Sequence, residues 1–231
     1  MKKFLISGVV SSVQLFGEKV TVFQLETGKV KFPVTVFGNY GRALAEKVVD
    51  GLRATISGEL VQNHFTNAEG KEVSQVQLVA DEVMLGTQGE VNSVQLWGRV
   101  ATEPATTVTK NGNRVTHFAV VDNTVRRTGD GSYEKEAHFF NVDGWNEVSD
   151  QTAQIHKGQK VIITGTLRKN VWQPAEGEVR SEIRVNATGL EVPSLTPVAV
   201  AEPVAVGASS APKPTTVEAL LEEFPDEELP F

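Results

Sequence analysis

A cation, an amide and a large aromatic ring recur at every second position near residue 170: Arg168, Asn170 and Trp172. In a β-strand successive side chains point to opposite faces, so residues two apart share one face. The preceding run, Val161–Leu167, has apolar residues at its odd positions. If these odd positions face a core, the cation and the ring project from the opposite surface. Such a surface can stack on a flat ring and attract an anion.

The same types of residue occur elsewhere in the chain. Val61, Asn63 and Phe65 repeat the spacing of the first group, with Lys71 close by. The segment Asp122–Glu136 carries a further group of candidates: Arg126, Arg127, Tyr133 and Lys135. The segment also contains three acids, and a solvated loop of mixed charge explains it equally well. Trp97 alternates with Leu96 and is therefore expected to face away from the core, towards a ligand or a second subunit.

Catalytic constellations are absent from the sequence. The four histidines are dispersed and lack metal-ligand spacing, and there is no phosphate-binding loop or nucleophile elbow. The nearest paired acids, Glu176 and Glu178, fall in a predicted turn. Without cysteine the chain has no disulfide, thiol nucleophile or thiolate metal site. We therefore expect a non-catalytic binding protein that needs neither cofactor nor metal.

The body of the chain is an internal repeat. Ala54–Leu60 matches Val161–Leu167 at a separation of 107 residues, and Phe65 then corresponds to Trp172. Upstream, Val20–Leu25 parallels Val115–Val120. Collinear matches of this kind indicate two copies of one structural unit.

Each copy is predicted to be rich in β-strands. Short runs of Val, Ile, Phe and Thr are separated by Gly, Asn and Asp turns, and they lie at 94–100, 115–121, 139–142, 161–167 and 183–187 in the second copy. Helical patterns are confined to Gly41–Val49 and Glu147–His156, each before the fourth strand. This order predicts an all-β fold of two tandem OB-folds, which are five-stranded Greek-key barrels, followed by a disordered C-terminal tail.

The predicted boundaries are residues 1–87 for the first barrel and 88–193 for the second. A flexible linker is expected at 194–217 and an acidic, partner-binding tail at 218–231. From Glu218 onwards there are six carboxylates and no Lys or Arg, and the chain ends on the apolar residues Leu229, Pro230 and Phe231. A solubilising tail is one interpretation of the acidic run. The apolar end favours docking into a basic-rimmed pocket on another protein, through Asp226, Glu227, Glu228, Leu229, Pro230 and Phe231.

The net charge of −7 resides mostly in this tail. Residues 196–231 have seven acids and one lysine, or −6, which leaves −1 for residues 1–195. A nearly neutral body can still hold a local basic groove. The charged start of the chain is followed by a run that Ser and Gly interrupt, which argues against export, and no apolar segment is long enough to cross a membrane. We therefore expect a cytoplasmic location.

The sequence resembles bacterial single-stranded DNA-binding proteins, and specifically those with two OB-folds per chain. Three segments carry the resemblance: Val91–Val100, Gly158–Trp172 and the tip Asp226–Phe231. The first copy is similar through Phe37–Gly38 and Gly51–Val79. The pattern departs from the family at Ala137 and Arg126, which stand roughly where other aromatic residues are expected.

The resemblance implies sequence-independent binding of single-stranded DNA in replication, recombination, repair and the response to DNA damage. It also implies a nucleoid-associated homodimer with four OB-folds, whose tail recruits replication, recombination and repair proteins. The expected DNA-binding residues are Trp172, Arg168, Asn170, Arg126, Arg127, Tyr133, Lys135, Phe139, Trp97, Arg99, Phe65, Lys71, Phe32 and Phe37, with the second copy as the dominant platform. The alternative is a protein-interaction adaptor in which the barrels have little or no affinity for DNA. An OB module for structured RNA is a third, weaker alternative.

Overall fold

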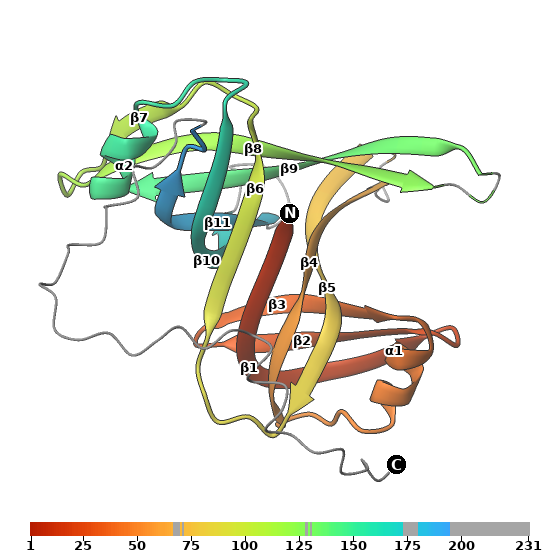
Figure 1. Cartoon of the computed structure of the whole chain (residues 1–231). Coiled ribbons are helices and arrows are strands. Elements are labelled where there is room, and N and C mark those ends of the chain that lie inside the picture. Colours follow the sequence, from red (N-terminus) through yellow and green to blue (C-terminus); the bar gives the residue numbers. More distant parts are fainter. Residues whose placement is uncertain (67–69, 71, 128, 130, 173–179, 195–231) are drawn as a thin grey trace, which may run out of the picture. The chain divides into compact units, whose positions relative to one another are not determined.

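The computed structural model describes residues 1–66, 70, 72–127, 129, 131–172 and 180–194. Its described part forms a compact unit, Met1–Ser194. Eleven strands form one sheet in the order β2-β3-β5-β4-β1-β6-β10-β11-β9-β8-β7. Extra pairings of β1 with β2 and of β6 with β8 close the two ends of this sheet into two barrels. The all-β prediction of two OB-folds is confirmed (Figure 1).

The first barrel contains β1 (Lys2–Phe16), β2 (Val20–Thr27), β3 (Val30–Phe37), β4 (Arg53–Thr66) and β5 (Glu72–Leu85). Helix α1 (Gly38–Ala45) lies in the chain between the third and fourth strands. Alternating residues such as Phe4, Phe23 and Leu25 fill the interior, and each is less than 4% exposed. The buried Thr21 hydroxyl donates to the Gly41 carbonyl at 2.8 Å, which fixes the helix against the second strand.

The second barrel repeats this plan with β6 (Asn92–Val100), β8 (Arg114–Arg127), β9 (Tyr133–Trp145), β10 (Lys160–Trp172) and β11 (Arg180–Glu191). Helix α2 (Glu147–Thr152) again precedes the fourth strand, and a short strand, β7 (Ala105–Val108), is added at the edge. The buried Thr116 hydroxyl lies 3.3 Å from the Ser149 carbonyl, as Thr21 lies near Gly41 in the first barrel. The internal repeat predicted from the sequence is therefore a structural repeat.

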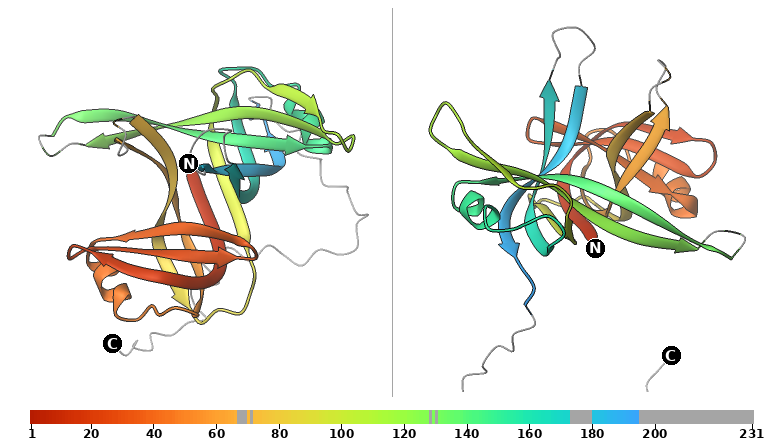
Figure 2. Two further views of the ribbon diagram at one scale, coloured as in Figure 1. Left: turned by 180° about the vertical axis from the view of Figure 1, so that it is seen from behind. Right: turned by 90° about the horizontal axis from the view of Figure 1, so that it is seen from above.

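Strands β1 and β6 join the two barrels by antiparallel pairing, from Lys2 opposite Leu96 to Ile6 opposite Asn92. The two strands run side by side in the left view of Figure 2. Phe4 is paired with Val94 at the centre of this contact. Each strand is the first of its own barrel. The contact therefore pairs equivalent strands of the two repeat copies, as a two-fold interface pairs the same surface of two subunits.

Two expected elements differ from those observed. The predicted helix Gly41–Val49 is observed as α1, which begins earlier, at Gly38, and ends at Ala45. The predicted helix Glu147–His156 is observed as α2, which ends at Thr152. The segment Asp122–Glu136 was expected to be a loop, but β8 continues to Arg127 and β9 begins at Tyr133. Val125 pairs with Lys135 and Arg127 with Tyr133. The segment is thus a long β-hairpin arm, in which backbone N–H and C=O groups bond across the two strands instead of to water.

The predicted linker and acidic tail, apart from Ser194, lie outside the described residues. Within the described part, no helix is long and apolar enough to span a membrane.

Candidate nucleic-acid interface

The outer face of β10 carries the residues with which the sequence argument began. Val161, Ile163 and Leu167 are at most 2% exposed, whereas Arg168 and Asn170 are exposed and Trp172 is 45% exposed. The predicted alternation is therefore confirmed. The β10 strand presents a cation and an indole on the same surface, outside the barrel core.

A row of polar side chains continues this face across the neighbouring strands. Arg168 on β10 pairs with Arg184 on β11. Arg184 donates to both oxygens of Asp143 on β9, at 2.6 and 2.9 Å, and His117 Nδ1 on β8 lies 2.7 Å from the same carboxylate. Asn141 donates to Glu182, which also forms an ion pair with Arg184. Arg168 and Arg184 carry like charges on neighbouring strands, but Asp143 and Glu182 neutralise Arg184 and remove the repulsion.

The charge state of this row follows from its contacts. Burial alone would raise the pKa of Asp143, but hydrogen bonds from Arg184 and His117 outweigh it and hold this pKa below 3.8. Burial opposes the charge of Arg184, but its carboxylate partners Asp143 and Glu182 outweigh burial and raise its pKa above the ordinary arginine value. Arg184 was not singled out in the sequence, although its place between the apolar Ile183 and Val185 predicts an outward side chain.

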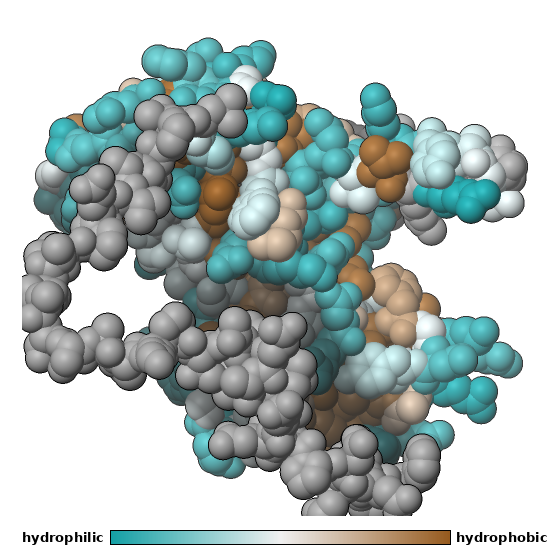
Figure 3. Space-filling view, in the orientation of Figure 1, coloured by the Kyte–Doolittle hydropathy of each residue, from teal (hydrophilic) through white to brown (hydrophobic). Residues whose placement is uncertain are grey.

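The β8–β9 arm carries a second group of candidates. Arg127 and Lys135 are exposed, Tyr133 is 72% exposed and Phe139 is 47% exposed. On the face shown in Figure 3, a hydrophobic patch interrupts the hydrophilic surface of this arm. Val125 on β8 is 57% exposed. The backbone of Arg126 belongs to β8, but its side chain lies outside the described residues. The arm thus combines cations with exposed rings.

Trp97 and Arg99 line an open pocket of about 490 Å³ on the second barrel. Trp97 is 49% exposed and faces away from the core, as expected. Arg99 donates to the Gly158 carbonyl at 3.0 Å. Lys160 also lines this pocket and was not predicted from the sequence. The pocket provides an aromatic wall with two cations, at a different place from the Arg168–Trp172 face.

The first barrel exposes three phenylalanines. Phe65 is 44% exposed on β4, and Phe37, at the end of β3, is 52% exposed. Phe16 was missed by the sequence analysis and is 53% exposed. Phe16 and Phe37 both pair with Val20, which lies between them. Phe16 precedes the Gly17 turn, and an aromatic residue beside a hairpin turn was the signal that could have identified it.

Two residues from the predicted set require correction or lie outside the description. Phe32 is only 1% exposed and pairs with Leu25 inside the first barrel. It belongs to the core, so the prediction that Phe32 contacts DNA is wrong. Lys71 lies outside the described residues. The partner-binding set Asp226–Phe231 also lies outside them.

Among the described residues, no group of three or more His, Asp or Glu side chains is placed to hold a metal ion. The buried His138, for example, accepts a hydrogen bond from the Gln62 backbone N–H through Nδ1 at 3.1 Å. The candidate surface therefore consists of rings, cations and hydrogen-bonding groups.

Comparisons with known proteins agree with this surface chemistry. The model of the Single-strand binding protein family matches residues 91–193, the second barrel. A single-stranded DNA-binding protein of Thermus aquaticus is 26% identical over 219 residues, which cover 86% of this chain and 79% of that protein. One from Thermus thermophilus is 31% identical over 146 residues, which cover 61% of this chain and about half (52%) of the relative.

The fold has a counterpart among solved structures. The wild-type single-stranded DNA binding protein from Thermus aquaticus superposes with a TM-score of 0.65 at 19% identity, over 86% of this chain and 95% of that one. The matched relatives are named as DNA-binding proteins and not as enzymes. The chain thus has two OB barrels in the expected order, its second barrel matches the Single-strand binding protein family, and its sequence is similar to bacterial single-stranded DNA-binding proteins.

Proposed function

We propose that this protein binds single-stranded DNA without sequence preference. The observation that supports this most directly is the outer face of β10, where Arg168, Asn170 and the exposed ring of Trp172 project together from the barrel that matches the family model. Sequence-independent binding of single strands combines a cationic track for phosphates with aromatic faces for bases. The rings and cations of the β8–β9 arm extend the same chemistry.

In the cell the protein would coat exposed strands in the cytoplasm, at the nucleoid, during replication, recombination and repair. We further propose that two chains form a homodimer with four barrels and that the acidic tip recruits partner proteins. The size of the particle tests the dimer. Light scattering coupled to gel filtration should give about twice the chain mass of 25.0 kDa. A mass near that of a single chain would contradict the dimer.

Tryptophan fluorescence during titration with oligothymidine tests DNA binding. Quenching is expected, because an indole that stacks on a base loses emission, and the affinity should fall as salt rises, because bound phosphates release counterions. The variant Trp172→Phe, which retains a ring, separates the signal of this indole from those of Trp97 and Trp145. Absence of both quenching and binding at low salt would overturn the proposed function.

A further inference from the structure

The two barrels are linked by a second contact, away from the β1–β6 joint, between the β4–β5 hairpin of the first barrel, called here the first barrel's arm, and β9 of the second barrel. Gln62 on β4 of the first barrel meets His138 and Phe139 on β9 of the second. The Gln62 backbone N–H donates to His138 Nδ1 at 3.1 Å, and the Phe139 backbone N–H donates to Gln62 Oε1 at 2.9 Å. His138 is only 2% exposed. Two reciprocal hydrogen bonds with a buried ring hold the first barrel's arm against the third strand of the second.

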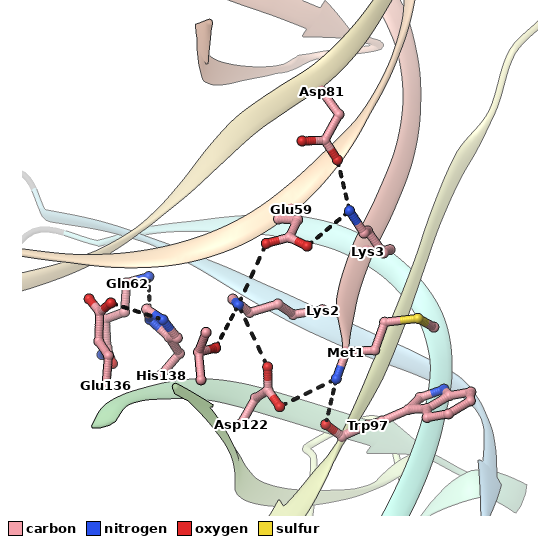
Figure 4. Close-up of polar contacts among 11 residues, drawn as sticks. Met1, Lys2, Lys3, Glu59, Gln62, Asp81, Trp97, Asp122, Glu136 and His138 are labelled. Carbon is pink, nitrogen blue, oxygen red and sulfur yellow. Dashed lines mark hydrogen bonds and ion pairs between the residues drawn. The ribbon is translucent and has the colours of Figure 1, made fainter. Parts of the chain in front are cut away.

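Charged groups surround this contact in a dense cluster (Figure 4). Lys2 is 5% exposed, and its ammonium lies 3.7 Å from Glu59, 3.6 Å from Asp122 and 3.1 Å from the Thr124 hydroxyl. These partners come from both barrels. Removal of its carboxylate partners would leave the buried Lys2 charge uncompensated, so these ion pairs favour the observed crossing of β1, β4 and β8.

The repeat contains the counterpart of the contact. Position 62 corresponds to Lys169 at the separation of 107 residues, and the strand registers make Lys31 the equivalent of Phe139. Lys169 Nζ donates to the Lys31 carbonyl at 3.1 Å. Each barrel's fourth strand therefore contacts the other barrel's third strand. The Gln62 contact has two hydrogen bonds and includes the buried His138 ring, whereas the Lys169 contact is a single exposed hydrogen bond.

Exposed rings stand on both sides of the Gln62 contact. Phe65 lies three residues beyond Gln62 on β4, and Phe139 is the residue whose backbone Gln62 binds. Both rings are more than 40% exposed, although they belong to different barrels. We propose that Gln62 and His138 act as a clamp of positioning residues, which hold the first barrel's arm so that Phe65 serves the DNA face of the second barrel. This inference rests on the proposed DNA binding.

Protonation of His138 would open the clamp. Its Nδ1 accepts the hydrogen bond from the Gln62 backbone N–H. A proton on Nδ1 would make it a donor that faces the Gln62 N–H, so this hydrogen bond would be lost. The charged groups that face the ring are Lys2 on β1, His64 on β4, Asp122 on β8 and Glu136 on β9. Burial and then Lys2 lower the pKa of His138 below 6.5, which keeps the ring neutral and the clamp closed at neutral pH.

A mutant cycle on binding of an oligothymidine of about 8 nucleotides, which fits within one OB-fold, tests the clamp. In the wild-type chain, Phe65→Ala should weaken binding about 5–10-fold, the loss of one stacked base. In a His138→Phe background the same substitution should change affinity less than about twofold, since the arm no longer places Phe65 on the DNA. Lys169→Met, the repeat's equivalent of a Gln62 substitution, is the matched control and should leave the Phe65 penalty unchanged.

The pH dependence distinguishes a clamp from general structural damage. The Phe65→Ala penalty should shrink as the pH falls through the pKa of His138, which lies below the ordinary histidine value of about 6.5, and this trend should vanish in His138→Phe. Gln62→Ala offers a second, milder opening of the clamp if His138→Phe fails to fold by circular dichroism. An equal Phe65 penalty in both backgrounds, or no penalty in the wild type, would overturn the clamp while DNA binding stands. No binding by the wild-type chain would instead overturn the proposed function.

Discussion

Asp143 occupies the place on the second barrel that Thr35 occupies on the first. His117 pairs with Asp143 as Val22 pairs with Thr35, and Arg184 corresponds to Gln77, whose amide donates to Thr35 Oγ1 at 2.6 Å. The first barrel therefore has a neutral triad where the second has a charged one. Asp143 and Arg184 are 14% and 17% exposed, so each depends on its partner for compensation of a partly buried charge.

Loss of one member of the charged triad should destabilise the fold. Arg184→Gln leaves the Asp143 carboxylate largely desolvated, and we expect the free energy of unfolding at pH 7 to fall by about 1–3 kcal/mol. The triple variant His117→Val, Asp143→Thr, Arg184→Gln installs the first barrel's triad and should lose less than the single variant. Urea unfolding at pH 7 measures both. An equal or larger loss in the triple variant would contradict the argument.

The same triad predicts the response to acid. Because the folded pKa of Asp143 is depressed, its stabilisation is present above about pH 4 and is lost as the pH falls through the lower folded value. The urea midpoint of the wild type should therefore decline below about pH 4 more steeply than that of the triple variant. Parallel declines would show that Asp143 contributes nothing to acid sensitivity.

The aromatic residues at positions 172 and 65 are equivalent in the repeat but differ in ring size. Trp172→Ala should weaken oligothymidine binding by roughly 10–100-fold, and Phe65→Ala by less, because indole offers the larger stacking face and base stacking contributes about 1–3 kcal/mol. Fluorescence anisotropy with a labelled oligomer measures both variants. An equal or larger loss from Phe65→Ala would contradict the larger contribution of Trp172.

At the scale of elements, the strand pattern was readily predicted and the arm was not. Runs such as Val161–Leu167 alternate cleanly because one face is buried, and the repeat supplied the element order. The arm lacks an apolar alternation, because the residues on its inward face, such as Asp122 and Thr124, are polar and contact the buried Lys2. Its strands are held by cross-strand pairing, from Asp122 opposite His138 to Arg127 opposite Tyr133, which local sequence does not reveal.

The candidate site was predicted in part for similar reasons. Exposure of Trp172 and Trp97 followed from parity within strands. Phe32 was misassigned, since a ring at the start of the third strand faces either core or groove, and only the register with Leu25 decides it. The clamp between Gln62 and His138 joins residues 76 positions apart in different barrels. No pattern within one copy of the repeat could indicate that contact.

The cations of the β8–β9 arm should determine part of the salt dependence of binding. Arg127→Ala with Lys135→Ala should lower the slope of log affinity against log salt by about 1.4, because each phosphate contact to a single strand contributes about 0.7. Lys110→Ala, an exposed lysine in the turn before β8, is the control and should leave the slope unchanged. An unaltered slope in the double variant would show that the arm is only a solvated hairpin.

At the scale of the whole molecule, pairing of β1 with β6 makes the two barrels parts of one sheet. Hydrogen bonds of the Gln62 and Lys169 contacts add two further links. A DNA strand that passes from one barrel to the other therefore meets surfaces whose spacing is set within the unit Met1–Ser194. We therefore expect DNA binding to be a property of the barrels, separate from the acidic terminal run.

Removal of Leu229–Phe231 tests that separation. The deletion takes away the apolar tip but none of the tail's acids, so the net charge of −7 and its electrostatic repulsion of DNA are unchanged. Affinity for oligothymidine should therefore stay within about twofold of wild type at each salt concentration, because the rings and cations on the barrels are intact. Replacement of the tip by Gly-Ser-Gly keeps the chain length as a control. If both variants lose DNA binding, the tip participates in the DNA complex itself, and the assignment of binding to the barrels alone is wrong.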